Sequence, residues 1–207
     1  MGFSIKSVNK SIRILLCFLF VINTAAALWT PLFSIFVIQH VAGATLAIIG
    51  LTSAVYSVMK SVLQIPIANY LDSRAGEEDD FKVLFVGILI ASVCSFALMF
   101  LGKIWQLSII QLLWGVADAC TMAAYYAIFS HHIDSRSAAL EWSLYSVGGI
   151  TVAVAIGGLV GGFVAESYGF SIIFFSAGVM NVLALFLLAF LYPYMKVMRP
   201  PKELPKA

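Results

Sequence analysis

Long runs of apolar residues, separated by short polar segments, organise this chain from end to end. An α-helix rises about 1.5 Å per residue, so about 20 apolar residues cross a ~30 Å hydrocarbon core. The runs lack the short alternation of barrel strands, and an all-α fold follows. We predict six transmembrane helices, at Ile14–Ile38, Leu46–Leu71, Val83–Leu101, Ile104–Phe129, Ala138–Ala165 and Phe170–Tyr194.

Composition agrees with a polytopic membrane protein. The 207 residues are 62% hydrophobic and 11% charged, whereas soluble domains are about 45–50% apolar and about 25% charged. We expect an N-terminal segment at 1–13, a six-helix transmembrane domain at 14–194 and a tail at 195–207. Because the tail carries Pro200, Pro201 and Pro205, it is predicted to be disordered.

The positions of the basic residues predict the orientation. Of the twelve basic residues, Lys103 alone falls on one side of the membrane, and Lys60 lies within a span. The other ten fall on the opposite side of the membrane. Cytoplasmic loops are enriched in Lys and Arg, so we expect both termini to be cytoplasmic. The basic residues on that side are Lys6, Lys10, Arg13, Arg74, Lys82, Arg136, Lys196, Arg199, Lys202 and Lys206.

Lys60 lies near the middle of an otherwise uncharged span. A charge at that depth costs about 2.5–3.5 kcal/mol on insertion scales, so it normally has a partner or water and marks a functional pathway. Asp118 lies at similar depth in the fourth span, which makes it the candidate partner. The alternative is a buried ion pair that specifies helix packing and has no transport role.

Polar residues at spacings of three and four surround both charges and predict one polar face on each helix. Such residues line a solute pathway, or else hydrogen bond between helices. We expect a pathway for a small molecule or an ion. Its candidate residues are Lys60, Asp118, Gln64, Asn23, Trp29, Gln111 and Tyr125.

Other chemistries find little support in the sequence. Cys17, Cys94 and Cys120 are isolated within spans, which does not favour disulfides or a metal site. The adjacent His131 and His132 are interpreted as a solvated loop pair, and the acidic run 77–80 as a solvated loop. No phosphate-binding loop or nucleophile–base set is visible. We therefore expect no enzyme activity, cofactor, metal or nucleic-acid partner.

Several segments resemble the major facilitator superfamily of transporters. Residues 68–76 resemble its motif between helices two and three, with Asp72 at the acidic position and Arg74 displaced by one. Residues 157–162 resemble its glycine-rich motif in helix five, without the proline of antiporters. Gln111 stands where many members have arginine. The segments 60–67, 71–81 and 132–142 resemble small six-helix members, which implies that 207 residues form a whole gene product.

The resemblance implies a secondary transporter in the plasma (bacterial inner) membrane, built from two six-helix halves with a midplane site. Since one half alone would leave Lys60 and Asp118 toward lipid, we expect a parallel homodimer, or a heterodimer with another six-helix half. The alternative function is a non-transporting assembly factor or receptor of the same fold. Purified protein in liposomes would separate the two.

An inner gate is also implied by the resemblance. Its candidate residues would break and re-form ion pairs during alternating access; otherwise they are ordinary interfacial charges. The glycines of the fifth span either permit close helix packing or form a hinge. The candidate gate residues are Asp72, Arg74, Arg136 and Glu141.

Overall fold

The computed structural model describes residues 9–74 and 76–195, which are helical almost throughout. Most of the predicted segments at 1–13 and 195–207 lie outside the described residues. Eight α-helices and four short 3-10 or π segments follow one another along the described chain. Their bounds are α1 Lys10–Ala27, η2 Thr30–Leu32, α2 Phe33–His40, α3 Leu46–Ser73, α4 Glu78–Ala97, η3 Leu98–Phe100, α5 Ile104–His132, α6 Ala138–Ser143, η4 Leu144–Val152, α7 Ala153–Tyr168, α8 Phe170–Leu191 and η5 Tyr192–Tyr194.

Six helical stretches are long and apolar enough to cross a membrane, which confirms the predicted number of spans. Two of the six are broken. In the first, the 3-10 segment η2, which contains Pro31, separates α1 from α2. Proline lacks the N–H that would continue the hydrogen bonds of α1. In the fifth, the π segment η4 separates α6 from α7.

The sequence interpretation was wrong at the start of α4, the helix of the third predicted span. The acidic run, expected to be a solvated loop, forms the start of α4, with Glu78, Asp79 and Asp80 in the first turn. Negative charges are favourable there because the helix N-terminus carries a partial positive charge. Glu77 and Asp80 are moreover buried. His131 and His132 end α5 and are not in a loop.

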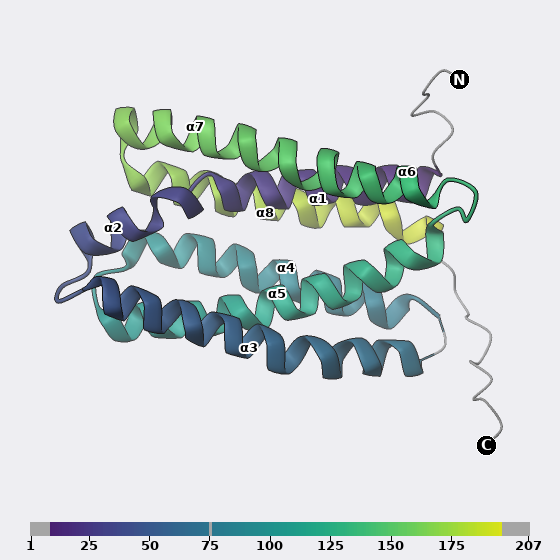
Figure 1. The fold of residues 1–207 in the computed structure, drawn as a ribbon, viewed down its shortest axis with the longest axis horizontal. Helices are drawn as coiled ribbons and strands as arrows, with labels where there is room; N and C mark the ends of the chain where they lie inside the picture. The colour runs from purple at the N-terminus through teal and green to yellow at the C-terminus, as the bar shows by residue number, and fades with distance from the viewer. Residues whose placement is uncertain (1–8, 75, 196–207) are drawn as a thin grey trace.

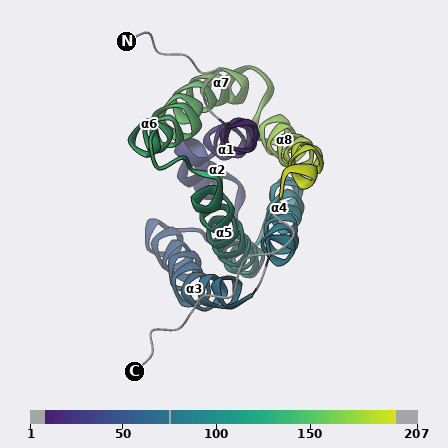
Figure 2. The same ribbon diagram turned by 90° about the vertical axis from the view of Figure 1, so that its right-hand side faces the viewer.

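The helices form two groups that meet along one seam (Figures 1 and 2). In one group α5 packs between α3 and α4; in the other α1 packs against α7 and α8, and α4 joins the groups by packing on α8. Seen from the end in Figure 2, α3 and α7 lie at opposite ends of the bundle. The described ends of the chain, near α1 and η5, lie at the same end of the bundle as α6.

Two apolar clusters fill the bundle. The first, around Phe18, Tyr125 and Leu188, lies toward the described chain ends. The second, around Val37 and Phe174, lies toward α2. Along α1, α5 and α8, the polar residues Asn23, Thr121 and Asn181 lie between the two clusters.

Close packing of α7 on α1 depends on glycine. A Cβ on Gly157 would lie 2.6 Å from the Thr24 carbonyl oxygen, and one on Gly161 would collide with the backbone of Leu28; nothing lies within 4 Å of a Cβ on Gly162. These contacts support the packing interpretation for Gly157 and Gly161.

We predict that Gly161→Ala lowers the free energy of unfolding by about 1–3 kcal/mol, because the added methyl group forces α1 and α7 apart. The matched control is Gly162→Ala, one residue away on the same helix. Since its methyl group meets no atom and alanine favours helix, it should be neutral or stabilising by up to about 1 kcal/mol. Unfolding in mixed micelles measures both; equal effects would contradict this account of the contact.

Candidate functional site

The candidate site is built where α3 and α5 approach most closely. Gly115 of α5 lies against the backbone of α3: a Cβ there would be 2.6 Å from the Tyr56 carbonyl oxygen and 2.9 Å from the Met59 Cβ. The next turn of α5 places Asp118 opposite the next turn of α3, which carries Lys60. The glycine therefore brings the two helices close enough for their charged side chains to meet.

Asp118 accepts two polar contacts from α3 on a single carboxylate oxygen. Its Oδ2 lies 2.6 Å from the Lys60 Nζ and accepts a hydrogen bond of 2.5 Å from the Tyr56 hydroxyl. Hydrogen bonds to an ionised group are shorter and about twice as strong as neutral ones. The three side chains form one charge-neutral unit that joins α3 to α5.

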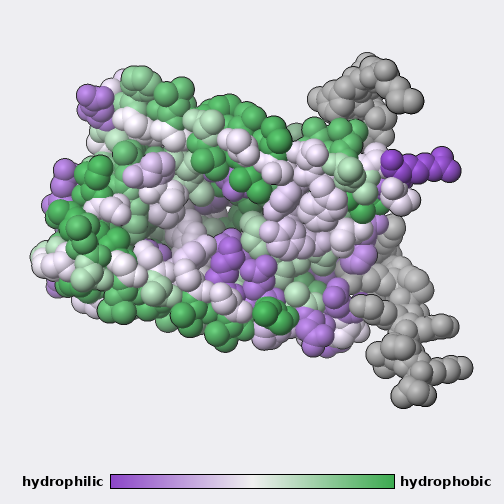
Figure 3. All heavy atoms as spheres, viewed as in Figure 1, coloured by the Kyte–Doolittle hydropathy of each residue, from purple (hydrophilic) through white to green (hydrophobic). Residues whose placement is uncertain are grey.

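The ion pair is accessible from one side. The side chains of Lys60 and Asp118 are 33% and 21% exposed. In Figure 3, hydrophilic residues gather beside a hollow in the middle of the face that is toward the viewer. Within the described residues, the other ion pairs lie at the bundle end that carries the start of α4. One side of the Lys60–Asp118 pair therefore lies at the surface of the six-helix bundle.

The other predicted pathway residues occupy different environments. Asn23 lines a cavity together with Asp118, and Gln64 lines a shallow hollow on α3 with Asp72. Tyr125 is fully buried, and its hydroxyl donates a hydrogen bond of 3.4 Å to the Leu15 carbonyl oxygen.

Trp29 packs edge-on against Trp114, in the apolar cluster near α2. Its ring is therefore part of the bundle's packing. Gln111 is half-buried on α5. Of the predicted set, the structure joins Lys60 to Asp118 directly. It also places Asn23 and Asp118 in the lining of one cavity.

The four predicted gate residues form no ion pairs with one another among the described residues. Glu141 is buried and accepts hydrogen bonds from the Ser137 hydroxyl at 3.0 Å and from the Asp134 backbone N–H at 3.1 Å. Arg74 lies over the ring of Tyr70. In this conformation Glu141 holds the turn before α6.

Sequence reasoning missed a cluster of one buried glutamate and two histidines at that end. Glu77 is 0% exposed, and its Oε1 lies 3.6 Å and 3.7 Å from the Nδ1 atoms of His131 and His132. The His132 Nε2 lies 3.1 Å from the Tyr194 carbonyl oxygen. This cluster connects the start of α4 and the end of α5 with η5. Glu77 and the histidines are far apart in sequence, so no local pattern could have paired them.

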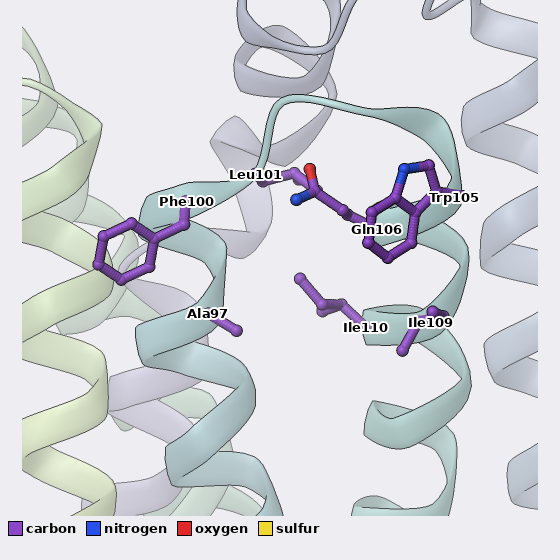
Figure 4. Close-up of a pocket in the computed structure, with 7 residues that line it drawn as sticks. All are labelled: Ala97, Phe100, Leu101, Trp105, Gln106, Ile109 and Ile110. Carbon is purple, nitrogen blue, oxygen red and sulfur yellow. The ribbon is translucent and has the colours of Figure 1, made fainter.

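Two further hollows lie at different depths in the bundle, and only the first borders the ion pair. A cavity of about 80 Å³ lies behind Asp118, lined by residues of α1, α4, α5 and α8. A second hollow of about 250 Å³, near the turn between η3 and α5, is lined by apolar side chains except for Gln106 (Figure 4). Because it offers no charge, it does not extend the polar site.

Together, six membrane-length helices and an ion pair at mid-bundle define a polytopic helical membrane protein with an accessible charged centre. The sequence model for the Major Facilitator Superfamily matches residues 14–207. The chain belongs to that superfamily. Membrane transport is the function common to it.

Individual proteins show the same relationship. The chain is 26% identical over 167 residues to the proteins titled multidrug resistance protein MdtG of Salmonella arizonae and Salmonella newport. That alignment covers 77% of this chain and 39% of each relative. A POT family transporter, PepTSo, superimposes with a TM-score of 0.72 at 10% identity, covering 96% of this chain and 40% of that structure. The chain thus spans about two-fifths of the length of these proteins.

We predict that the Lys60–Asp118 pair contributes about 1–3 kcal/mol of coupling energy to stability, as expected for a charged hydrogen bond. Lys60→Met and Asp118→Asn should each destabilise the protein, because each leaves one polar group without its partner. The double variant should cost less than the sum of the two. The measurement is thermal unfolding in detergent of the wild type, the two single variants and the double variant, which form a double-mutant cycle. Strictly additive losses of stability would rule out the coupling.

Proposed function

We propose that this chain is one half of a secondary active transporter that moves a small solute by alternating access. The observation that carries the proposal is the Lys60–Asp118 pair, held at mid-bundle and open to one side. A charged solute or a proton that binds either partner would weaken the pair. Loss of the pair would in turn loosen the contact between α3 and α5, which couples occupancy to movement.

A second six-helix half would complete the pathway. The chain spans about two-fifths of its relatives, and a partly exposed ion pair facing hydrocarbon is costly. We propose a homodimer with its two-fold axis along the membrane normal. A heterodimer with another six-helix half is the nearest variant.

Small residues on both outer helices support such pairing. On α3, Gly50, Ala54, Ser57 and Ser61 follow the spacing of three and four and are exposed. On the fifth span, the positions where a Cβ would meet no atom include Gly162. Small residues at a helix surface permit close approach of a second helix in lipid.

The substrate and orientation are likewise proposals. The names of the MdtG relatives make drug-like organic solutes the first class to test. The basic residues favour cytoplasmic termini in the bacterial inner membrane. Asp72, Arg74, Arg136 and Glu141 lie toward that side and would form the inner gate in another conformation.

Transport is tested in liposomes with an imposed pH gradient, using ethidium as a cationic probe and carboxyfluorescein as an anionic one. We predict flux of at least one probe, reduced about tenfold or more by Lys60→Met and by Asp118→Asn, since a lost charged contact is worth about 1.5–3 kcal/mol. The control is Lys82→Met, which removes a lysine that pairs with Glu78 at the bundle end. Wild-type flux in both site variants would refute the role of the pair.

The dimer is tested by native mass spectrometry from lipid nanodiscs. We expect a mass of two chains, and a shift toward one chain in Ser57→Trp, because the bulky ring would hold the second half away from α3. Val86→Trp, at an exposed position on α4, should leave the dimer intact. A strictly monomeric wild-type protein would refute the homodimer.

A further inference from the structure

His132 ends α5 in a buried position where oxygen atoms lie against both nitrogens of its ring. Its side chain is 4% exposed. The Nδ1 atom lies 3.1 Å from the Ile128 carbonyl oxygen and 3.7 Å from the Glu77 Oε1, and the Nε2 atom lies 3.1 Å from the Tyr194 carbonyl oxygen. Each ring nitrogen therefore faces a carbonyl oxygen, which can only accept a hydrogen bond.

A neutral imidazole cannot satisfy both of these carbonyl oxygens. It carries one N–H donor and one acceptor nitrogen, whereas the imidazolium ion donates from both nitrogens. In either neutral tautomer a lone pair of the ring would face a carbonyl oxygen, and a buried polar atom without a suitable partner costs free energy. Only the protonated ring of His132 can donate to Ile128 and Tyr194 together.

The surroundings of His132 also supply the negative charge that a buried cation needs. Glu77, at the start of α4, has a side chain that is 0% exposed, and its Oε1 faces the Nδ1 atoms of both His131 and His132. The C-terminal end of a helix carries a partial negative charge, which favours cations in the last turn. A carboxylate and a helix end therefore both stabilise positive charge on His132.

Other titratable groups of the described residues lie on the elements around this cluster. Asp80 is buried in the first turn of α4, and Glu141 accepts a hydrogen bond from the Ser137 hydroxyl. By their ordinary titration, the histidines are the groups of this set that change charge between about pH 5 and 8. The further titratable side chains on these elements are Lys10, Arg13, Asp72, Arg74, Glu78, Asp79, Lys82, Asp134, Arg136, Tyr192 and Tyr194.

The short segment η5, which ends the sixth span, is fastened to three other helices. The Tyr194 carbonyl oxygen faces His132 of α5, and the Tyr194 hydroxyl accepts a hydrogen bond of 2.5 Å from Lys10 of α1. The ring of Tyr192 meets Phe81 of α4 edge-on, with the ring centroids 5.2 Å apart. Of these three contacts, the one to α5 depends on a side chain that gains or loses a proton near neutral pH.

We propose that His132 is a pH-sensitive latch that holds η5 against α5. The protonated ring donates to Tyr194 and to Ile128, with Glu77 as its counter-ion. When the ring gives up one proton to the solvent, the other stays on Nδ1, because that nitrogen faces both the Ile128 carbonyl oxygen and the Glu77 carboxylate. The lone pair of Nε2 then faces the Tyr194 carbonyl oxygen, and this contact is lost.

The latch is therefore closed at the lower end of the histidine titration range and opens as the pH rises. It would let the end of the sixth span separate from α5, while Glu77 keeps its contact with the Nδ1 side of the ring. The latch would act whether or not the chain moves a solute.

The protonation of His132 is tested by NMR of isotope-labelled histidine in the full chain, reconstituted in lipid nanodiscs. The chain has three histidines, His40, His131 and His132, so single substitutions assign each signal. We expect His132 to change from imidazolium to a neutral ring between about pH 5 and 8, with the remaining proton on Nδ1. A ring that keeps one charge state throughout that range, or a neutral ring protonated on Nε2, would overturn the latch.

The release of η5 is tested by hydrogen exchange at the backbone amides of Tyr192, Tyr194 and Met195. His132→Phe keeps a flat ring but removes both donors. At about pH 5 it should raise exchange there about tenfold or more over wild type, since a charged hydrogen bond is worth about 1.5–3 kcal/mol. At about pH 8 the two proteins should exchange alike, because the wild-type latch is then open.

His40→Phe is the matched control for this substitution. The Nδ1 of His40 likewise lies 3.1 Å from the carbonyl oxygen four residues earlier, that of Phe36, but His40 ends α2 and not α5. It should leave exchange in η5 unchanged at both pH values. Equal exchange in His132→Phe and wild type at the lower pH, or a difference that does not depend on pH, would refute the proposal.

Discussion

The contact between α3 and α5 depends on one constraint: a charge within a membrane span must be neutralised inside the protein. Lys60 and Asp118 meet that constraint together, with Tyr56 as a second donor to the same oxygen. The pair can form only because Gly115 lets the two backbones approach closely. Charge pairing and close backbone packing thus occur at the same contact between α3 and α5.

The remainder of the bundle holds that contact at mid-depth. Two apolar clusters fill its ends, where hydrophobic side chains from five or more helical segments pack together. The polar residues Asn23, Thr121 and Asn181 occupy the layer between the clusters. In a hydrocarbon environment such residues are stable only when their hydrogen bonds are met internally. Their placement together explains how a helical bundle this apolar can surround a polar centre.

At the end of the bundle near α6 the chain uses charge differently. Glu77, His131 and His132 tie the start of α4 to the end of α5, and Glu141 holds the turn before α6. These contacts lie near the ends of the predicted spans, where water is available to charged groups. The mid-bundle pair therefore joins α3 to α5 within the span, and this cluster joins α4 to α5 near its end.

Much of the fold could be read from the amino-acid sequence because lipid imposes a simple rule. A membrane span needs about 20 apolar residues, so the six spans and the unusual depth of Lys60 and Asp118 were visible in the order of residues alone. The breaks at Pro31 and η4, the pairing of Lys60 with Asp118 and the burial of Glu77 were settled by the tertiary structure. These features depend on which helix faces meet, and residues as distant in the chain as Asn23 and Asn181 come together only when four helices pack around one cavity.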